Sequence, residues 1–244
     1  MGNTCAMDGG ITKAILYVDG FNLYRRCLES HPDTKWLDLV AFARNLLPEY
    51  RVVKVHYFTA RIKPVASSDP RAPQRQQAYL RALATLSKVE VHLGHFRADV
   101  RWMVAHPQEI DPDTGKRRLV RVRKIEEKGS DVNLAVRMLV DAHAGRAGLY
   151  VALTNDSDQA ETLRVIKSEL GQATGLVLPM ETAKGSKELM GTAPDFVGYV
   201  TRDLLLASQL PDKILDEHGT ITRPPEWAEK SDGPQPSAWG PSNR

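Results

Sequence analysis

The chain has 244 residues, 42% hydrophobic and 26% charged, with a formal net charge of +3. This composition is ordinary for a globular protein and allows one large α/β domain or two small ones. No apolar run reaches the ~18 residues of a transmembrane helix, and the N-terminus lacks the pattern of a signal peptide, so we expect a cytoplasmic protein without membrane contact. The two scattered cysteines agree with a reducing compartment.

Apolar and turn-forming residues alternate in the pattern of a βαβ protein. The predicted elements are, in chain order, a strand at 11–18, a helix at 20–30, a helix at 37–47, a strand at 51–59, a helix at 74–87, a strand at 89–93, a helix at 130–143, a strand at 148–153, a helix at 159–169, a strand at 175–179 and helices at 186–190 and 200–209. A turn signal at 111–115 predicts an inserted β-hairpin. The alternation predicts an α/β fold with a Rossmann-like, mostly parallel sheet.

The same pattern divides the chain into three parts. Residues 1–10 are predicted to form a flexible N-terminus, and residues 11–210 the folded domain. Residues 211–244 lose periodicity and are rich in proline, so we predict a tail that is a candidate contact for a partner protein.

Four aspartates occupy sequence positions where a Rossmann-like sheet binds its ligands. Asp19 directly follows the first predicted strand, Asp156 and Asp158 follow the fourth, and Asp131 opens a helix. Ligands of an open α/β sheet bind at the carboxyl ends of its strands. Converging carboxylates repel one another unless a cation joins them. Hard oxygen ligands select Mg²⁺ or Mn²⁺, so the sequence predicts a metal site with a phosphodiester substrate.

Each carboxylate also has a structural explanation. Asp19 precedes a glycine and suits an ordinary turn. Asp131 suits the positive end of a helix dipole. Asp158 with Glu161 fits a capping box. For any one residue the structural explanation weighs more, but caps do not require an aspartate directly beyond two buried strands, so we favour the functional explanation for the set.

Nearby polar residues are candidates for substrate contact. Asn22 lies three residues beyond Asp19, Ser157 lies between two of the aspartates, and Lys128 and Lys184 lie near the predicted mouth. Helix capping is an equal alternative for Asn22 and the stronger one for Ser157. Each lysine taken alone fits a solvated surface position.

A basic segment at 116–124 holds six cationic side chains and no acid. Strand alternation places Arg121 and Arg123 on one face, which suits contact with a phosphate backbone. Protection of an edge strand by charge is at least an equal alternative. His92 and His95 are expected at the surface or the core edge rather than on a metal.

Three segments, at 18–22, 127–135 and 155–158, resemble the signatures of the NYN domain family, whose members resemble PIN nucleases. Residues 186–189 with 207–211 resemble the end of a bacterial branch of that family. The resemblance covers about residues 11–211. It implies a Rossmann-like, PIN-like sheet, an acidic Mg²⁺ or Mn²⁺ pocket and ribonuclease activity on RNA.

On that resemblance, Asp19, Asp131, Asp156 and Asp158 match the acidic positions of the family, as metal ligands and catalytic groups, and Asn22 matches its amide. Arg137 departs from the pattern, because many relatives carry an acid there.

The expected reaction is hydrolysis of RNA by a metal-bound hydroxide, with one or two ions held by the four aspartates. The first alternative is a regulatory module that binds RNA or a nucleotide without catalysis, which Arg137 favours. The second is a phosphoryl-transfer enzyme with an aspartyl nucleophile. That enzyme usually carries a second acid two residues after the first, where this chain has Phe21.

Overall fold

The computed structural model describes residues 7–8, 10–62, 69–180 and 185–228. Its main sheet has the strand order β5-β4-β3-β2-β6-β7-β8, with β1 paired to β2. The strands are β1 (Met7–Asp8), β2 (Ile11–Asp19), β3 (Arg51–Ala60), β4 (Val89–Val104), β5 (Leu119–Lys128), β6 (Leu149–Leu153), β7 (Ala173–Leu178) and β8 (Phe196–Tyr199). All neighbouring pairs are parallel except β4 with β5 and β1 with β2. The predicted α/β, Rossmann-like fold is confirmed.

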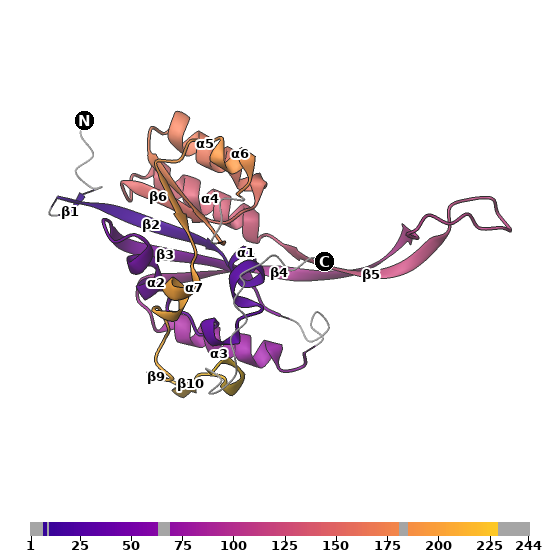
Figure 1. Cartoon of the computed structure of the whole chain (residues 1–244), viewed down its shortest axis with the longest axis horizontal. Coiled ribbons are helices and arrows are strands. Elements are labelled where there is room, and N and C mark those ends of the chain that lie inside the picture. Colours follow the sequence, from indigo (N-terminus) through magenta and orange to yellow (C-terminus); the bar gives the residue numbers. More distant parts are fainter. Residues whose placement is uncertain (1–6, 9, 63–68, 181–184, 229–244) are drawn as a thin grey trace.

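Helices cover both faces of this sheet. They are α1 (Gly20–Leu23), α2 (Leu39–Leu46), α3 (Ala72–Ala84), α4 (Ser130–His143), α5 (Ala160–Ser168), α6 (Lys187–Met190) and α7 (Arg202–Leu206). Figure 1 shows α4, α5 and α6 on one side and α2, α3 and α7 on the other. None of the helices in the described ranges is long and apolar enough to cross a membrane.

Strand alternation sends side chains of β2 into two cores. Leu16 and Val18 pack toward α2 and α3, and Ile15 and Tyr17 pack toward α4. All four are buried because strands covered on both faces carry near-continuous apolar runs. Because β2 is parallel to its neighbours β3 and β6, the carboxyl ends of the three strands lie at one edge of the sheet, next to the two hydrophobic layers.

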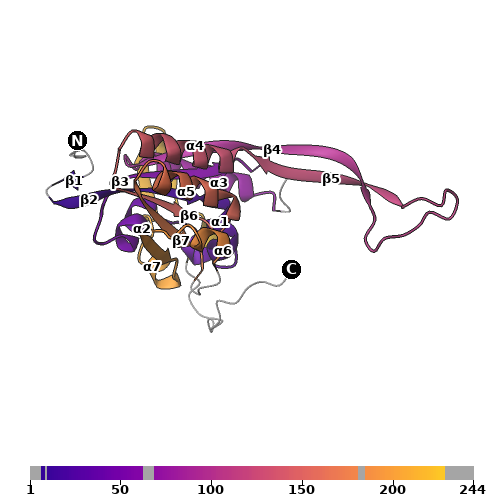
Figure 2. The same cartoon turned by 90° about the horizontal axis from the view of Figure 1, so that it is seen from above.

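The inserted hairpin is confirmed and is longer than predicted. The third predicted strand, at 89–93, continues to Val104 as β4, and beyond Gly94 it pairs only with β5. We call residues 96–127 the arm; Figures 1 and 2 show it projecting from the body of the protein. Trp102 lies on the arm and is 65% exposed, because no second layer covers this ribbon.

Part of the predicted tail is folded. Strands β9 (Lys213–Asp216) and β10 (Gly219–Thr222) form a hairpin, and the 3-10 turn η5 (Pro225–Trp227) follows. Trp227 lies 6.2 Å from the ring of buried Trp36, so the aromatic contact holds this segment on the core. Residues 229–244 lie outside the described residues. At the other end, β1 forms within the predicted flexible lead.

Candidate functional site

The acidic edge of the sheet is centred on Asp19 at the end of β2. This residue is 4% exposed, and one carboxylate oxygen accepts hydrogen bonds from the backbone N–H groups of Phe21 and Asn22. The Asn22 amide and the Thr154 hydroxyl donate to the other oxygen at 2.7 and 2.9 Å. Burial raises the pKa of Asp19, since the charged form loses its water shell, while the hydrogen bonds act in the opposite direction.

Asp131 lies in the first turn of α4, close enough to the other acidic residues for their charges to raise its pKa. Its pKa is raised to about 6, first by loss of water around it and then by the charges of Asp19 and Asp156. Glu127 and Asp158 add to the repulsion. The fold thus gathers the four predicted aspartates at one edge, together with Glu127, which the sequence prediction did not include.

No three of these aspartates bring carboxylate oxygens within 4.8 Å of one another. Within the described ranges, the one group of three His, Cys, Asp or Glu side chains with ligand atoms within 4.8 Å of one another lies elsewhere. Local hydrogen bonds explain the spacing. Asp19 is held by four donors, and Asp156 accepts from the N–H of Asp158 as the cap of the 3-10 turn η4 (Ser157–Gln159).

The predicted substrate-contacting residues are spread around this edge. Asn22 is half-buried and bonded to Asp19, so its amide is engaged in holding the turn. Ser157 is exposed at the start of η4, and Lys128 is exposed at the end of β5. Lys184 lies outside the described residues.

Arg121 and Arg123 lie on the arm and are exposed. The guanidinium of Arg121 stands 5.9 Å over the ring of Trp102 on the paired strand. This contact gives one arginine a structural role on the ribbon. Contact of the arm with RNA stays a prediction.

An aromatic hollow of about 280 Å³ opens beside the acidic edge. Six aromatic residues contribute to its lining: Phe21, Tyr24, Tyr57, Tyr79, Phe96 and Trp227. Arg25, Lys35 and Arg75 bring positive charge to the same wall, and Glu29 brings one negative charge. This site was not predicted from the sequence, because its residues come from separate segments and no local spacing connects them.

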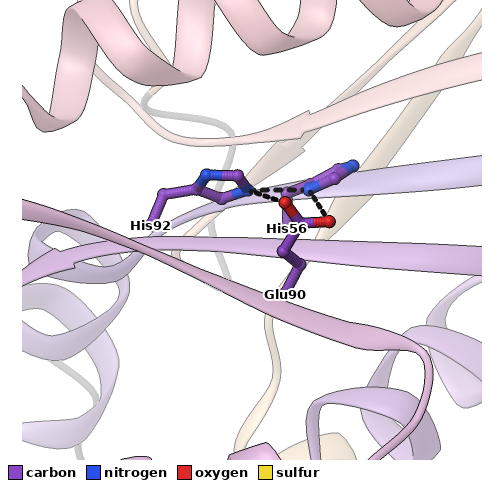
Figure 3. A group of neighbouring side chains, drawn as sticks. All are labelled: His56, Glu90 and His92. Atoms are coloured by element: carbon purple, nitrogen blue, oxygen red, sulfur yellow. Dashed lines mark hydrogen bonds and ion pairs between the residues drawn. The ribbon is translucent and has the colours of Figure 1, made fainter.

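A polar cluster lies on the α4 face of the sheet. Figure 3 shows His56 of β3 with Glu90 and His92 of β4, their polar ends turned toward one another. His56 Nδ1 lies 2.9 Å from His92 Nε2. On its other side, His56 Nε2 lies 3.1 Å from a carboxylate oxygen of Asp141 on α4.

His92 was expected at the surface or the core edge, and the other members of this cluster were not predicted as site residues. His56 and Asp141 sit singly within apolar segments; the register of β3 with β4 brings His56 beside Glu90, and Asp141 reaches His56 from α4. The one local signal is the spacing of Glu90 and His92, two residues apart on one strand face.

No protein-family model matches the chain. The chain is 28% identical to the protein named 6-hydroxy-3-succinoylpyridine 3-monooxygenase HspA of Pseudomonas putida, over 91% of this chain and 77% of that protein. A crystal structure of a protein of unknown function from Vibrio parahaemolyticus is similar with a TM-score of 0.48 and 16% identity, over 84% of this chain and 99% of the other. That structural similarity carries no functional argument.

The similarity to HspA corrects the expected reaction. HspA is named as an enzyme, which agrees with the expectation of catalysis, but its named reaction is an oxidation. Hydrolysis of RNA, and with it the description of the chain as a nuclease, is therefore contradicted. The expected Mg²⁺ or Mn²⁺ cofactor is wrong as well, because oxygen chemistry is carried by flavin, haem, copper or non-haem iron.

Proposed function

We propose that the chain is an oxidoreductase that inserts oxygen into a small aromatic molecule bound in the aromatic hollow. The observation that carries the proposal is the 28% identity to HspA across 91% of this chain. In a monooxygenase reaction, one atom of O₂ enters the substrate and the other leaves as water. The reaction consumes two electrons and two protons, so a reduced nicotinamide nucleotide is the co-substrate that we infer.

The hollow suits a single-ring substrate. Its volume of about 280 Å³ lies just below the ~300–1,000 Å³ range of small-molecule sites. Tyr57 and Tyr79 contribute rings 6.3 Å apart and nearly perpendicular, and Phe21 meets Phe96 edge to face at 5.9 Å. Rings in these arrangements favour an aromatic guest through stacking and edge contacts.

A cation in the wall would hold an acidic substituent. Lys35 is half-buried, with its ammonium 3.5 Å from the Tyr24 hydroxyl and 5.2 Å over the Tyr24 ring. Burial lowers the pKa of Lys35, because the charged form loses solvation there. A carboxylate on the ligand would give that charge a further anionic partner beside Glu29, which lines the same hollow. The named substrate of HspA, a succinoylpyridine, joins a ring to a carboxylate chain.

The first turn after β2 does not fit the pyrophosphate of a flavin or nicotinamide dinucleotide. In doubly wound folds that turn carries glycines in the pattern G-x-G-x-x-G and lets backbone N–H groups face the phosphates. Here Asp19 and Asn22 occupy the turn, and the N–H groups of residues 21 and 22 already donate to the Asp19 carboxylate. A second anion at this point would meet a buried carboxylate, so a nicotinamide or flavin dinucleotide would have to place its pyrophosphate elsewhere on the protein.

The test measures oxygen consumption and product formation by the purified chain. Substrates are 6-hydroxy-3-succinoylpyridine and 2-hydroxypyridine, which lacks the acidic chain, each with NADH or NADPH and with flavin or Fe²⁺ added in separate arms. We expect hydroxylated product from the acidic substrate. Absence of product and of coupled O₂ uptake in every arm would refute the proposal.

Lys35→Met tests the site within that assay. We expect KM for the acidic substrate to rise about 10-fold or more, since one charge-assisted contact contributes ~1.5–3 kcal/mol, with kcat nearly unchanged. The matched control is 2-hydroxypyridine, for which KM should not change. Equal effects on both substrates would show that Lys35 supports the fold of the hollow rather than an acidic substituent.

A further inference from the structure

Three potential metal ligands project from one face of two adjacent strands. His56 of β3 and Glu90 of β4 are register partners, and His92 lies two residues beyond Glu90. Register partners and residues two apart share a face of a sheet. The backbone of the sheet, rather than a loop, therefore fixes the three side chains relative to one another.

The spacing of their polar atoms suits one ion. His56 Nδ1 lies 2.9 Å from His92 Nε2 and 3.9 Å from Glu90 Oε2, and His92 Nε2 lies 3.6 Å from Glu90 Oε1. With metal–ligand bonds of ~2.0–2.2 Å, two ligands of a tetrahedral ion stand ~3.3–3.6 Å apart. One observed spacing is shorter than this range, one is at its upper limit and one is longer, so side-chain shifts of a few tenths of an ångström would place all three around one ion.

Asp141 contacts one imidazole nitrogen of His56 and so orients the other nitrogen, Nδ1, toward Glu90 and His92. His56 Nε2 is 3.1 Å from Asp141 Oδ2, which also accepts a hydrogen bond of 2.9 Å from the Tyr17 hydroxyl. Arg146 contacts the other Asp141 oxygen at 2.6 Å. A carboxylate on one imidazole nitrogen places the proton there and leaves the other nitrogen as a ligand, an arrangement recurrent in metal sites.

We propose that His56, Glu90 and His92 bind one divalent first-row transition-metal ion, with Asp141 as the positioning residue of His56. Two imidazoles and one carboxylate suit Zn²⁺, Co²⁺ or Fe²⁺ rather than Mg²⁺ or Ca²⁺. His56 is 4% exposed at its side chain, His92 16% and Glu90 42%. The solvent-facing side at Glu90 provides an entry path and the remaining coordination positions.

Two cations compete with the ion for Glu90. Lys54 Nζ lies 3.1 Å from Glu90 Oε2, and Arg137 lies 4.0 Å from Glu90 Oε1. Both side chains are about one-third exposed, so either can turn to water when a metal binds. The competition also predicts that Lys54→Met strengthens metal binding, because the carboxylate then has one rival fewer.

The experiment titrates the metal-free full chain, produced without a histidine tag, with Co²⁺ and with Zn²⁺. Visible absorption of Co²⁺ and calorimetry for Zn²⁺ report stoichiometry and affinity without reference to catalysis. The variants are His92→Asn and Glu90→Gln, whose side chains are partly exposed, and Lys54→Met. The matched control is His95→Asn, an exposed histidine three residues further along β4.

We expect one ion per chain, with visible Co²⁺ bands typical of mixed nitrogen and oxygen ligands. His92→Asn and Glu90→Gln should weaken binding at least ~10-fold, while His95→Asn leaves it unchanged. Circular dichroism and unfolding midpoints verify that each variant is folded. No stoichiometric binding by the parent, or equal affinity in the parent and His92→Asn, would overturn the proposal. Because the readout is binding alone, its failure is distinguishable from failure of the proposed oxidation.

Discussion

Removal of the charge at Asp131 should stabilise the protein at neutral pH. In the folded chain the pKa of Asp131 is raised to about 6, from a usual value of 3.8, first by loss of water and then by Asp19 and Asp156. The folded state therefore binds the proton more tightly than the unfolded state. Stability from this group is fully present below pH 3.8 and is lost as pH rises through 6. Asp131→Asn removes that loss.

The size of the effect follows from the shift and the exposure of the side chain. A shift of about two pKa units corresponds to ~3 kcal/mol in the free energy of unfolding. Asp131 is an exposed residue, so water and salt screen its repulsion and we reduce the expectation to ~1 kcal/mol. Loss of a favourable charge at the helix start offsets a few tenths of that value.

Urea unfolding of parent and Asp131→Asn from pH 4 to pH 8 measures this difference. We expect it to be near zero at pH 4 and ~1 kcal/mol in favour of the variant at pH 8. Asp203→Asn is the matched control, since Asp203 also stands in the first turn of a helix, α7, and no benefit at pH 8 is expected from it. A constant difference across the range would refute electrostatic crowding at the acidic edge.

Two further predictions concern stability. Gly94→Ala should lower the free energy of unfolding by ~1–3 kcal/mol. The added Cβ would meet the Glu127 side chain and lie 2.7 Å from the Lys128 carbonyl oxygen. A thermal unfolding midpoint equal to that of the parent would contradict this prediction. Ile221→Ala should cost ~2–4 kcal/mol, since Ile221 is 2% exposed in the core, whereas Leu215→Ala, at a position 78% exposed, should cost little. Equal effects of the last two would show that the β9–β10 hairpin is not docked in solution.

The layered sheet was predictable from sequence because its signals are local. The run 149–153 is apolar at every position and forms a strand buried at every position, and the helix at 130–143 has the predicted bounds. Strand β8 was missed because its four residues include Gly198 and all are only half-buried. The length of β4 was missed because its outer half alternates against solvent and carries no apolar face to bury.

The sites were harder to predict, since they depend on register and on long-range packing. The aspartates at strand ends were found and do gather at one edge. Their separation was not predictable, because hydrogen bonds such as the one from Thr154 to Asp19 fix where each carboxylate points. The pairing of His56 with Glu90 requires the β3–β4 register, which no sequence spacing supplies. The motifs led to a prediction of hydrolysis, and this prediction is contradicted by the similarity to HspA, which is named as a monooxygenase.

The aromatic hollow and the histidine cluster lie on opposite faces of the same strand. Tyr57 belongs to the hydrophobic layer on the α3 side and lines the hollow, whereas Phe58 belongs to the layer on the α4 side and stacks on His92 at 4.6 Å. A metal at the cluster is therefore separated from a ligand in the hollow by the thickness of the sheet. Electrons can cross such a layer, but an oxygen atom bound to the metal cannot reach the ligand. Metal binding by His92 and oxidation in the hollow are thus independent proposals, and a Co²⁺ titration that succeeds while every oxidation assay fails would show that this chain binds a metal on the α4 face without oxidising a ligand in the hollow.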